Sequence, residues 1–275
     1  MPPNVKIRQM PKAGCALGIF AVDISALSRL FARMSEPLYV IPDIHGQLAL
    51  LTEALDRITK DGGTEARIVF LGDYVDRGPD SRGVIETLMA GQAAGRDWIT
   101  LRGNHDQMFL DFLDQGRIDN PRMSKPGYTW QHHRLGGIET LASYGITATE
   151  SDRKHAESVA TVPQSHRDWL AGLPLTHMTD DLLLVHAGIR PGISLAEQNT
   201  DDLMWIRGEF HDHKGPYPWL IVHGHTPVDL PTHFGNRIDL DGGAGWGRAL
   251  WPAVFEGKKC WLLTENGREG LLPNG

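Results

Sequence analysis

The chain has 275 residues, of which 41% are hydrophobic and 22% charged, and this balance is typical of a folded globular protein rather than a disordered or collagen-like one. Its length allows a sizeable core in one large domain, or in one domain with an insertion. The formal net charge of -7 argues against a general nucleic-acid-binding surface, which would be basic. Two cysteines indicate no disulfide framework, and no apolar run is long enough to cross a bilayer. We therefore expect a cytoplasmic protein without membrane or nucleic-acid partners.

The first half of the chain alternates between short apolar runs and helical patterns. We interpret residues 1–35 as an N-terminal extension and residues 36–275 as one domain. Alternation of strands and helices implies parallel β-α-β units with right-handed crossovers. Asp80 or Ser81 is available to cap the second helix of this series. The expected strands are residues 38–41, 68–71 and 98–101, and the expected helices are residues 47–58, 81–89 and 105–113.

The region from about residue 116 to residue 180 interrupts this alternation, and we expect it to be a mostly helical insertion that covers one side of the site. Beyond residue 227, strand patterns recur without long helices between them. Asp239 and Asp241 precede a run of glycines and are expected to shape a turn rather than bind metal. The expected strands of the second half are residues 182–185, 220–222, 237–240, 249–256 and 259–264.

Five of the apolar runs end at residue types that bind metal ions. Strand ends in α/β folds lead into loops that carry the chemistry, so these side chains are expected to converge along one edge of a sheet. A single Asp after a strand is more often a helix cap, but caps do not explain Asp, Asn and His at successive strand ends. The sequence therefore predicts a metal centre. The residues concerned are Asp43, His45, Asp73, Asp76, Asn104, His105, His186 and His225.

The same blocks resemble, in order, the signatures of the phosphoprotein phosphatase family of calcineurin-like metallophosphoesterases. The similarity extends from about residue 39 to about residue 247, and five ordered blocks are far more specific than one. The third and fifth blocks are similar to the bacterial and phage branch, which includes serine/threonine protein phosphatases. The blocks are Asp-Ile-His-Gly at 43–46, Gly-Asp-Tyr-Val-Asp-Arg-Gly at 72–78, Arg-Gly-Asn-His-Asp at 102–106, His-Ala-Gly at 186–188 and Gly-His-Thr-Pro at 224–227.

The resemblance implies an α/β fold, the αββα sandwich of calcineurin-like metallophosphoesterases. In this fold two mixed sheets pack together and helices flank them on both outer faces. The helical insertion at about 116–180 would lie to one side. The strands beyond residue 227 would then form a meander in the second sheet.

The resemblance also implies a centre of two divalent ions, with Mn²⁺ as the first choice and Fe or Zn as alternatives, and mixed oxygen and nitrogen ligands suit these metals. It assigns Asp43, His45 and Asp73 to the first ion. It assigns Asp73, Asn104, His186 and His225 to the second ion, so that Asp73 bridges the two. Two such ions can hold a hydroxide for direct in-line attack on a phosphoryl group.

Further roles follow from the resemblance for an Asp–His pair and for two arginines. His105 would protonate the leaving oxygen, and Asp76 would orient the imidazole. Arg77 lies in the best-matched block, and Arg207 resembles the Trp-x-Arg phosphate contact of the bacterial and phage enzymes. Both guanidinium groups are expected to bind phosphate oxygens, whose geometry they match.

Two further residues lie in or beside the blocks. Arg102 is a third candidate for phosphate binding, but it could equally form an ion pair with Asp76 or Asp106. His223 stands two residues before His225, and we expect it to support the site rather than bind metal.

The function implied is hydrolysis of phosphoric monoesters, with phosphoproteins or phosphopeptides as substrates. Phosphoserine and phosphothreonine come first, with phosphotyrosine as an additional candidate. The alternatives are a symmetrical diadenosine tetraphosphatase or another nucleotide phosphohydrolase, and more remotely a non-catalytic metal-binding module. The insertion mixes basic and acidic residues around Tyr128 and Trp130, which we expect to suit varied phosphopeptides better than a polyphosphate. The charged residues are Arg117, Arg122, Lys125 and Arg134, with Asp119, Glu139, Glu150, Asp152 and Glu157.

Overall fold

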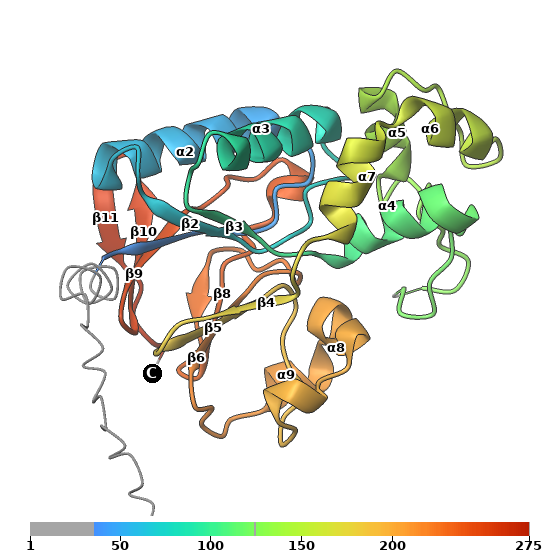
Figure 1. Ribbon diagram of the computed structural model, residues 1–275. Coiled ribbons are helices and arrows are strands. Elements are labelled where there is room, and N and C mark those ends of the chain that lie inside the picture. Colours follow the sequence, from blue (N-terminus) through green and yellow to red (C-terminus); the bar gives the residue numbers. More distant parts are fainter. Residues whose placement is uncertain (1–35, 124, 275) are drawn as a thin grey trace, which may run out of the picture. The chain divides into compact units, whose positions relative to one another are not determined.

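A computed structural model describes residues 36–123 and 125–274, and the N-terminal extension expected at 1–35 lies outside the described residues. Within residues 37–274 two β-sheets pack face to face between layers of helices (Figure 1). Helices α2 (Leu48–Gly62) and α3 (Ser81–Ala93) cover the outer face of one sheet. Helices α8 (Thr200–Trp205) and α9 (Gly208–Asp212) cover the outer face of the other. The predicted αββα sandwich is confirmed.

The first sheet has six strands in the order β11-β10-β9-β1-β2-β3. Its parallel part is formed by β1, β2 and β3, and the return strands β9, β10 and β11 add antiparallel to the other edge of β1. In β1, Leu38 is opposite Arg67 on one side and opposite Phe255 on the other. The strands are β1 (Leu38–Ile41), β2 (Arg67–Phe70), β3 (Trp98–Thr100), β9 (Ala253–Glu256), β10 (Lys259–Thr264) and β11 (Gly267–Gly270).

The second sheet has five strands in the order β4-β5-β6-β8-β7. Its centre is parallel, because β5, β6 and β8 run in the same direction. The edge strands β4 and β7 are antiparallel to their neighbours. The strands are β4 (Thr176–Met178), β5 (Leu182–Val185), β6 (Leu220–His223), β7 (Thr232–His233) and β8 (Arg237–Asp239).

The expected meander in the second sheet is wrong for two of its three strands. Only β8 belongs to the second sheet, whereas β9 and β10 complete the first sheet beside β1. In β9 the side chains of Ala253 and Phe255 face the core between the sheets, and Val254 belongs to the core under the helices. The alternation of β9 side chains between the two cores would suit either sheet. β9 joins the first sheet because it pairs with the edge of β1 that β2 leaves open. The predicted ligands consequently converge from two sheets rather than along one edge.

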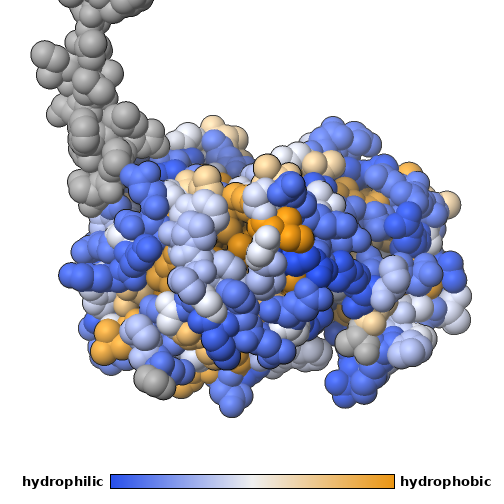
Figure 2. All heavy atoms as spheres, turned by 90° about the horizontal axis from the view of Figure 1, so that it is seen from below, coloured by the Kyte–Doolittle hydropathy of each residue, from blue (hydrophilic) through white to orange (hydrophobic). Residues whose placement is uncertain are grey.

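Alternation along β1 shows how the core divides. Leu38 and Val40 belong to the cluster between the sheets, whereas Tyr39 and Ile41 belong to the cluster under the helices. A strand with both faces buried is typical of a parallel sheet that is covered on both sides. The outer face seen in Figure 2 is mostly hydrophilic, and its hydrophobic side chains gather in small patches.

The described part of the segment between β3 and β4 contains four helices, but the insertion expected to be mostly helical at about 116–180 is less than half helical. The described residues among 116–136 form turns and loops, and residues 176–178 are strand β4. The segment begins with α4 (Asn104–Gln115) and continues with α5 (Gly137–Ser143), α6 (His155–Thr161) and α7 (Gln164–Ala171). Trp130 from this segment is fully buried and packs on Phe109 and Phe112 of α4, with ring centroids 5.5 and 4.6 Å apart. The insertion is thus fixed to α4, the helix that carries two predicted site residues. None of the described helices is long and apolar enough to cross a membrane.

Candidate metal centre

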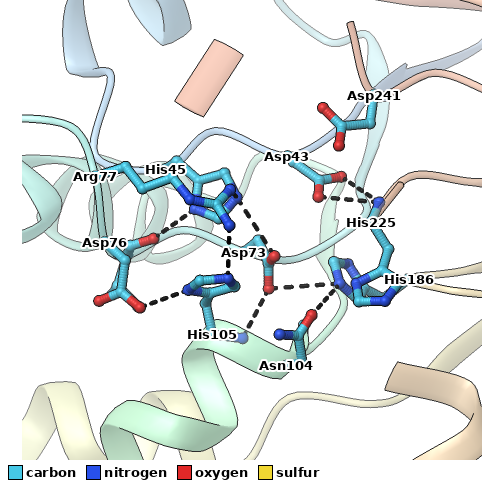
Figure 3. Close-up of polar contacts among 12 residues, drawn as sticks. Asp43, His45, Asp73, Asp76, Arg77, Asn104, His105, His186, His225 and Asp241 are labelled. Atoms are coloured by element: carbon cyan, nitrogen blue, oxygen red, sulfur yellow. Dashed lines mark hydrogen bonds and ion pairs between the residues drawn. The ribbon is translucent and has the colours of Figure 1, made fainter. Parts of the chain in front are cut away.

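The loops that follow five strands meet at one place (Figure 3). Asp73 lies at the middle of this place, after β2. One side of it is faced by His45, after β1, and the other by His186, after β5. His105 and His225 complete two groups of three whose potential ligand atoms lie within 4.8 Å of one another. The structure therefore brings together side chains that are up to 180 residues apart in the chain.

Several of these residues have an unusual backbone conformation. His45, Asp73, Asp76, Arg77 and His225 have φ angles between 49° and 75°, in the left-handed region. Such conformations are uncommon for residues other than glycine, and they concentrate at functional sites. Interloop hydrogen bonds stabilise them, for example from the His45 N–H to the Asp73 carbonyl at 2.8 Å. The surrounding fold thus imposes the turns that direct these side chains to one point.

The imidazoles are oriented as metal ligands would be. The Nδ1–H groups of His45 and His186 donate to backbone carbonyls, of Val75 and Leu71 respectively, each at 2.9 Å. Their Nε2 atoms then carry the lone pairs, and each lies 3.5 Å from a carboxylate oxygen of Asp73. Nε2 of His225 is buried and has no hydrogen-bond partner among the described residues. A buried polar atom without a partner is unfavourable unless a ligand satisfies it.

The buried carboxyl groups of Asp73 and Asp43 also indicate a metal site. Burial raises the pKa of Asp73, and the charge of Asp106 raises it further. Burial likewise raises the pKa of Asp43, with Asp241 as the next cause. The Asp43 carboxylate accepts the backbone N–H of His225 at 3.0 Å. Buried carboxylates this close together are compensated by cations, so the donor set fits divalent metal ions.

Asn104 lies beside the second group of imidazoles. Its side-chain oxygen is 2.9 Å from Nε2 of His186, and its own position at the start of α4 is buried. An amide oxygen is a neutral donor that suits the same metals as a carboxylate. All six residues predicted as metal ligands are therefore brought together, and their roles stay a proposal.

His105 and Asp76 form a buried pair. Nδ1 of His105 donates to the Asp76 carboxylate at 2.6 Å. Asp76 also accepts from Nε1 of Trp130 at 2.9 Å and from the Thr140 hydroxyl at 2.6 Å. Burial raises the pKa of Asp76, and the hydrogen bonds from Thr140 and Trp130 oppose that rise. Because all three neighbours are donors, we take Asp76 as an ionised acceptor that fixes the tautomer of His105.

Three supporting residues were not identified from the sequence. Trp130 and Thr140 contact Asp76 from 54 and 64 residues away, and no local pattern indicates such contacts. Asp106 accepts the backbone N–H groups of Asp73, Tyr74 and Gly103, each at 2.9 Å. It thereby ties the loop after β2 to the start of α4. Its place in the Arg-Gly-Asn-His-Asp block was the one available sequence signal.

The profile of the calcineurin-like phosphoesterase family matches residues 36–246. The chain belongs to this family. The asymmetrical bis(5'-nucleosyl)-tetraphosphatase PrpE of Anoxybacillus flavithermus is 28% identical over 77% of the chain and 87% of its own length. Serine/threonine-protein phosphatase 1 of Salmonella typhimurium is also 28% identical, over 83% of the chain and 96% of its own length.

Solved structures agree on the fold of this phosphoesterase. A putative diadenosine tetraphosphatase superposes with a TM-score of 0.57 at 21% identity, over 83% of this chain and 93% of that one. A cold-active protein-tyrosine phosphatase of a Shewanella species superposes with a TM-score of 0.58 at 18% identity, over 86% and 80%. Relatives with nucleotide and protein substrates are thus similarly distant.

A cavity of about 220 Å³ opens beside the metal centre of the phosphoesterase. Arg77 and Arg207 line it, as expected for phosphate contacts. An Nη–H of Arg77 donates to Nε2 of His105 at 3.0 Å, and the guanidinium lies 4.6 Å from the ring centroid of Trp246. The half-exposed Trp246 was not predicted as a site residue, although it lies within the region of family similarity.

Arg102 does not line this cavity. Its backbone N–H donates to the Pro174 carbonyl at 2.9 Å, and its Nε is buried without a partner among the described residues. Neither of the predicted alternatives, an ion pair with Asp76 or with Asp106, forms within the described part of the chain. A role for Arg102 in phosphate binding is thus the weakest of the three arginine predictions.

The basic and acidic residues of the insertion differ in whether they line the cavity. Lys125, Tyr128 and Arg134 line the cavity. The acidic residues of the insertion do not, and Asp73 is the one carboxylate among the described residues that line it. The expectation of mixed charge at the site was therefore wrong, because the sequence shows which charges are present but not where each side chain points.

His223 has the supporting place that we expected. It is fully buried, its Nδ1 lies 3.0 Å from the Gly224 carbonyl, and its Nε2 accepts from Arg237 at 3.0 Å. Both ring nitrogens are therefore engaged. Asp239 and Asp241 accept backbone N–H groups two residues ahead, at 3.1 and 2.9 Å, which is the geometry of a side-chain turn.

Proposed function

We propose that this phosphoesterase is a dinuclear metal-dependent phosphomonoester hydrolase whose substrates are cytoplasmic phosphoproteins or phosphopeptides. Phosphoserine and phosphothreonine are the first substrates, with phosphotyrosine in addition. The observation that carries the proposal is the position of Asp73. The Nε2 atoms of His45 and His186 lie on either side of it, each 3.5 Å from a carboxylate oxygen, and the hydrogen-bonded pair of His105 and Asp76 lies next to it. Mn²⁺ is the first choice of metal, with Fe or Zn as alternatives.

The metal ligands in this proposal are those predicted from the sequence. Asp43, His45 and Asp73 would hold the first ion, and Asp43 lies beside them in Figure 3. The three potential ligand atoms that the structure groups within 4.8 Å on this side belong to His45, Asp73 and His105, so Asp43 would have to move towards the ion. Asp73, Asn104, His186 and His225 would hold the second ion. When bound, two divalent ions would supply positive charge to the phosphoryl oxygens and would lower the pKa of a water molecule at the site.

The remaining residues act on the substrate directly. Arg77 and Arg207 would bind the non-bridging oxygens, because both line the cavity beside the centre. Nε2 of His105 accepts from Arg77 in this structure, and burial lowers the pKa of the imidazole. Once a phosphoryl group draws Arg77 away, His105 would take up a proton on Nε2 and give it to the leaving oxygen, while Asp76 keeps Nδ1 protonated through the 2.6 Å hydrogen bond. Transfer of this proton avoids expulsion of an alkoxide from a serine or threonine ester.

The size of the cavity is compatible with a phosphopeptide. Binding sites for drug-sized ligands commonly measure about 300–1,000 Å³, and this cavity has about 220 Å³. That space accepts a phosphoryl group and one side chain, and the rest of a peptide would lie outside it. Two nucleosides joined by a polyphosphate would extend well beyond it.

A nucleotide hydrolase is the second candidate, and one observation favours it. Four cations and the aromatic rings of Tyr128, Trp205 and Trp246 line the cavity, and such a lining suits a polyphosphate with a stacked base. The relatives whose names specify diadenosine or bis-nucleosyl tetraphosphates support the same candidate.

The deciding experiment compares kcat/KM for a phosphoserine or phosphotyrosine peptide with that for diadenosine tetraphosphate at the same Mn²⁺ loading. We expect the peptide to be the better substrate. A ranking reversed by tenfold, or about 1.4 kcal/mol in transition-state binding, would move the assignment to the nucleotide enzyme. Asp73→Asn is the inactive control. No turnover of any phosphate ester with Mn, Fe or Zn would favour the metal-binding module.

A further inference from the structure

Arginine side chains on the rest of the domain are commonly neutralised by carboxylates. Arg122 forms an ion pair with Asp202 at 2.6 Å, and Arg268 forms one with Asp61 at 2.8 Å. Such pairs place each cation beside a compensating charge.

Four cations around the cavity lack such a pair. Exposed cations elsewhere, such as Lys258 and Lys259, also lack one among the described residues, so the distinguishing feature of the four is that they line one shared space. Arg77, Lys125, Arg134 and Arg207 all line it, and none of them forms an ion pair with a described carboxylate. Like charges that face a shared space repel one another, and an anion placed between them relieves the repulsion. Arg77 and Arg207 are explained by the transferred phosphoryl group, whereas Lys125 and Arg134 are not.

Lys125 and Arg134 come from the insertion and approach the side of the cavity where Arg77 lies. The Arg134 carbonyl accepts from Nε of Arg77 at 3.4 Å, which places this turn beside the His105 imidazole that Arg77 contacts. His105 is the group proposed to protonate the leaving oxygen. The backbone of Arg134 is therefore on the side where His105 lies, and Lys125 lines the same cavity.

The turn that carries them is held in place. The ring of Tyr128 stacks on His132, with centroids 4.1 Å apart and an interplanar angle of 20°. Nδ1 of His132 accepts the backbone N–H of Arg134 at 3.2 Å. Lys125 Nζ lies 6.0 Å from the Tyr128 ring centroid. These contacts hold the backbone that carries Arg134, while the side chains of Lys125 and Arg134 are exposed and accessible to a ligand.

We propose that Lys125 and Arg134 form a second anion subsite, beside Tyr128, for a negatively charged group on the leaving-group side of the substrate. The inference rests on the proposed hydrolase function and narrows its substrate class to phosphate esters with a second anionic group. In a phosphopeptide this group is the carboxylate of a neighbouring acidic residue. In a nucleotide it is a further phosphate.

The test is a double variant, Lys125→Ala with Arg134→Ala, assayed with Mn²⁺-loaded protein on substrates that differ in one charge. The pair is a phosphopeptide with Asp and Glu beside the phosphorylated residue and the same peptide with Asn and Gln there. 4-Nitrophenyl phosphate has no second anion and serves as the reference. The control is Lys258→Ala with Lys259→Ala, which removes two exposed cations that do not line this cavity.

We expect KM for the acidic peptide to rise about tenfold in the double variant, the size expected when hydrogen bonds to a charged group are lost. Values of kcat/KM for the neutral peptide and for 4-nitrophenyl phosphate should change less than about twofold, because neither occupies the subsite. Equal losses on all three substrates, or no loss on either the acidic peptide or diadenosine tetraphosphate, would overturn the proposal. A loss with diadenosine tetraphosphate but not with the acidic peptide would assign the anion to a nucleotide.

Direct binding separates this inference from the proposed function. Calorimetry with inorganic phosphate and pyrophosphate requires no turnover. We expect the protein to bind pyrophosphate more tightly than phosphate, and the double variant to lose that preference while it keeps its affinity for phosphate. Equal affinities for the two anions in the unsubstituted protein would refute the subsite even if the protein proves to be an active hydrolase.

Discussion

Thr140→Val tests whether the hydrogen bonds around Asp76 control proton transfer by His105. The substitution exchanges a hydroxyl for a methyl group of similar size at a fully buried position, so it changes polarity without creating a cavity. The Thr140 hydroxyl donates to Oδ1 of Asp76 at 2.6 Å and accepts the Asp76 backbone N–H at 2.8 Å. Both bonds are lost in the variant.

The remaining contacts set the magnitude. The Asp76 carboxylate keeps the donors from Trp130 and His105, and its backbone N–H keeps the Ser81 hydroxyl at 3.1 Å. The buried Ser81 hydroxyl, 3.2 Å from the Thr140 hydroxyl, loses that contact as well. The loss is therefore at least that of a charge-assisted bond, about 1.5–3 kcal/mol of folding free energy. The pKa of Asp76 should rise, because the Thr140 hydrogen bond lowers it in the native protein.

Activity should fall in a way that depends on the leaving group. General acid catalysis contributes about 10²–10⁴-fold, and a weakened Asp76–His105 pair should lose part of it, roughly tenfold in kcat for an alkyl phosphate. An aryl phosphate has a better leaving group and should lose less. Thr87→Val is a matched control, because the Thr87 hydroxyl donates to the Gly83 carbonyl at 2.7 Å inside α3.

The measurements are kcat for both ester types, metal content, and unfolding by urea. Equal losses of kcat on alkyl and aryl phosphates at unchanged metal content would refute the reasoning, since they would place the effect on substrate binding rather than on proton transfer. Unchanged kcat on the alkyl phosphate, with the expected loss of stability, would show that Thr140 serves folding alone.

Three further substitutions test other parts of the structure. Asp73→Asn should lose activity and at least one equivalent of metal, and Mn²⁺ should raise its Tm less than that of the unsubstituted protein; unchanged metal content would contradict a bridging role. Trp246→Leu should raise KM about two- to tenfold through loss of a cation–π contact to Arg77, and Trp246→Phe should recover part of this. Arg268→Met should lower the unfolding free energy by about 1 kcal/mol at pH 7. The hydrogen bond from Arg268 lowers the pKa of Asp61, so the stability that this ion pair contributes is present at neutral pH and is progressively lost as the pH falls below about 4. If Arg268→Met lowers the unfolding free energy in urea equally at pH 7 and at pH 3.5, the ion pair with Asp61 is not the source of the loss.

Local sequence determined the individual elements. The predicted bounds of β1, β5 and β10 agree with the structure, because each is a short run rich in apolar residues and bounded by polar residues or proline. Asp80 caps α3 and accepts the Gly83 N–H at 2.8 Å, as one of the two predicted caps. The end of α2 was missed by four residues, since its last turn, at residues 59–62, is exposed and carries no apolar residue.

The residues around Asp73 were also identified from the sequence, because each block places its ligand types within a few residues of a strand end. A strand end fixes the position of the loop that follows, and the loop fixes the direction of one or two side chains. His45 and Asp73 are examples, with left-handed backbones set by the turn directly after the strand.

Only the tertiary structure decided which distant groups support the site. The contacts of Trp130 and Thr140 with Asp76, the place of β9 beside β1, and the position of Lys125 at the cavity all join segments that are far apart in the chain. Periodicity shows which face of an element is apolar, but several partners can cover that face equally well. The choice between them depends on which arrangement buries the apolar surface and pairs the buried polar groups of the whole domain at once, and no single segment contains that information.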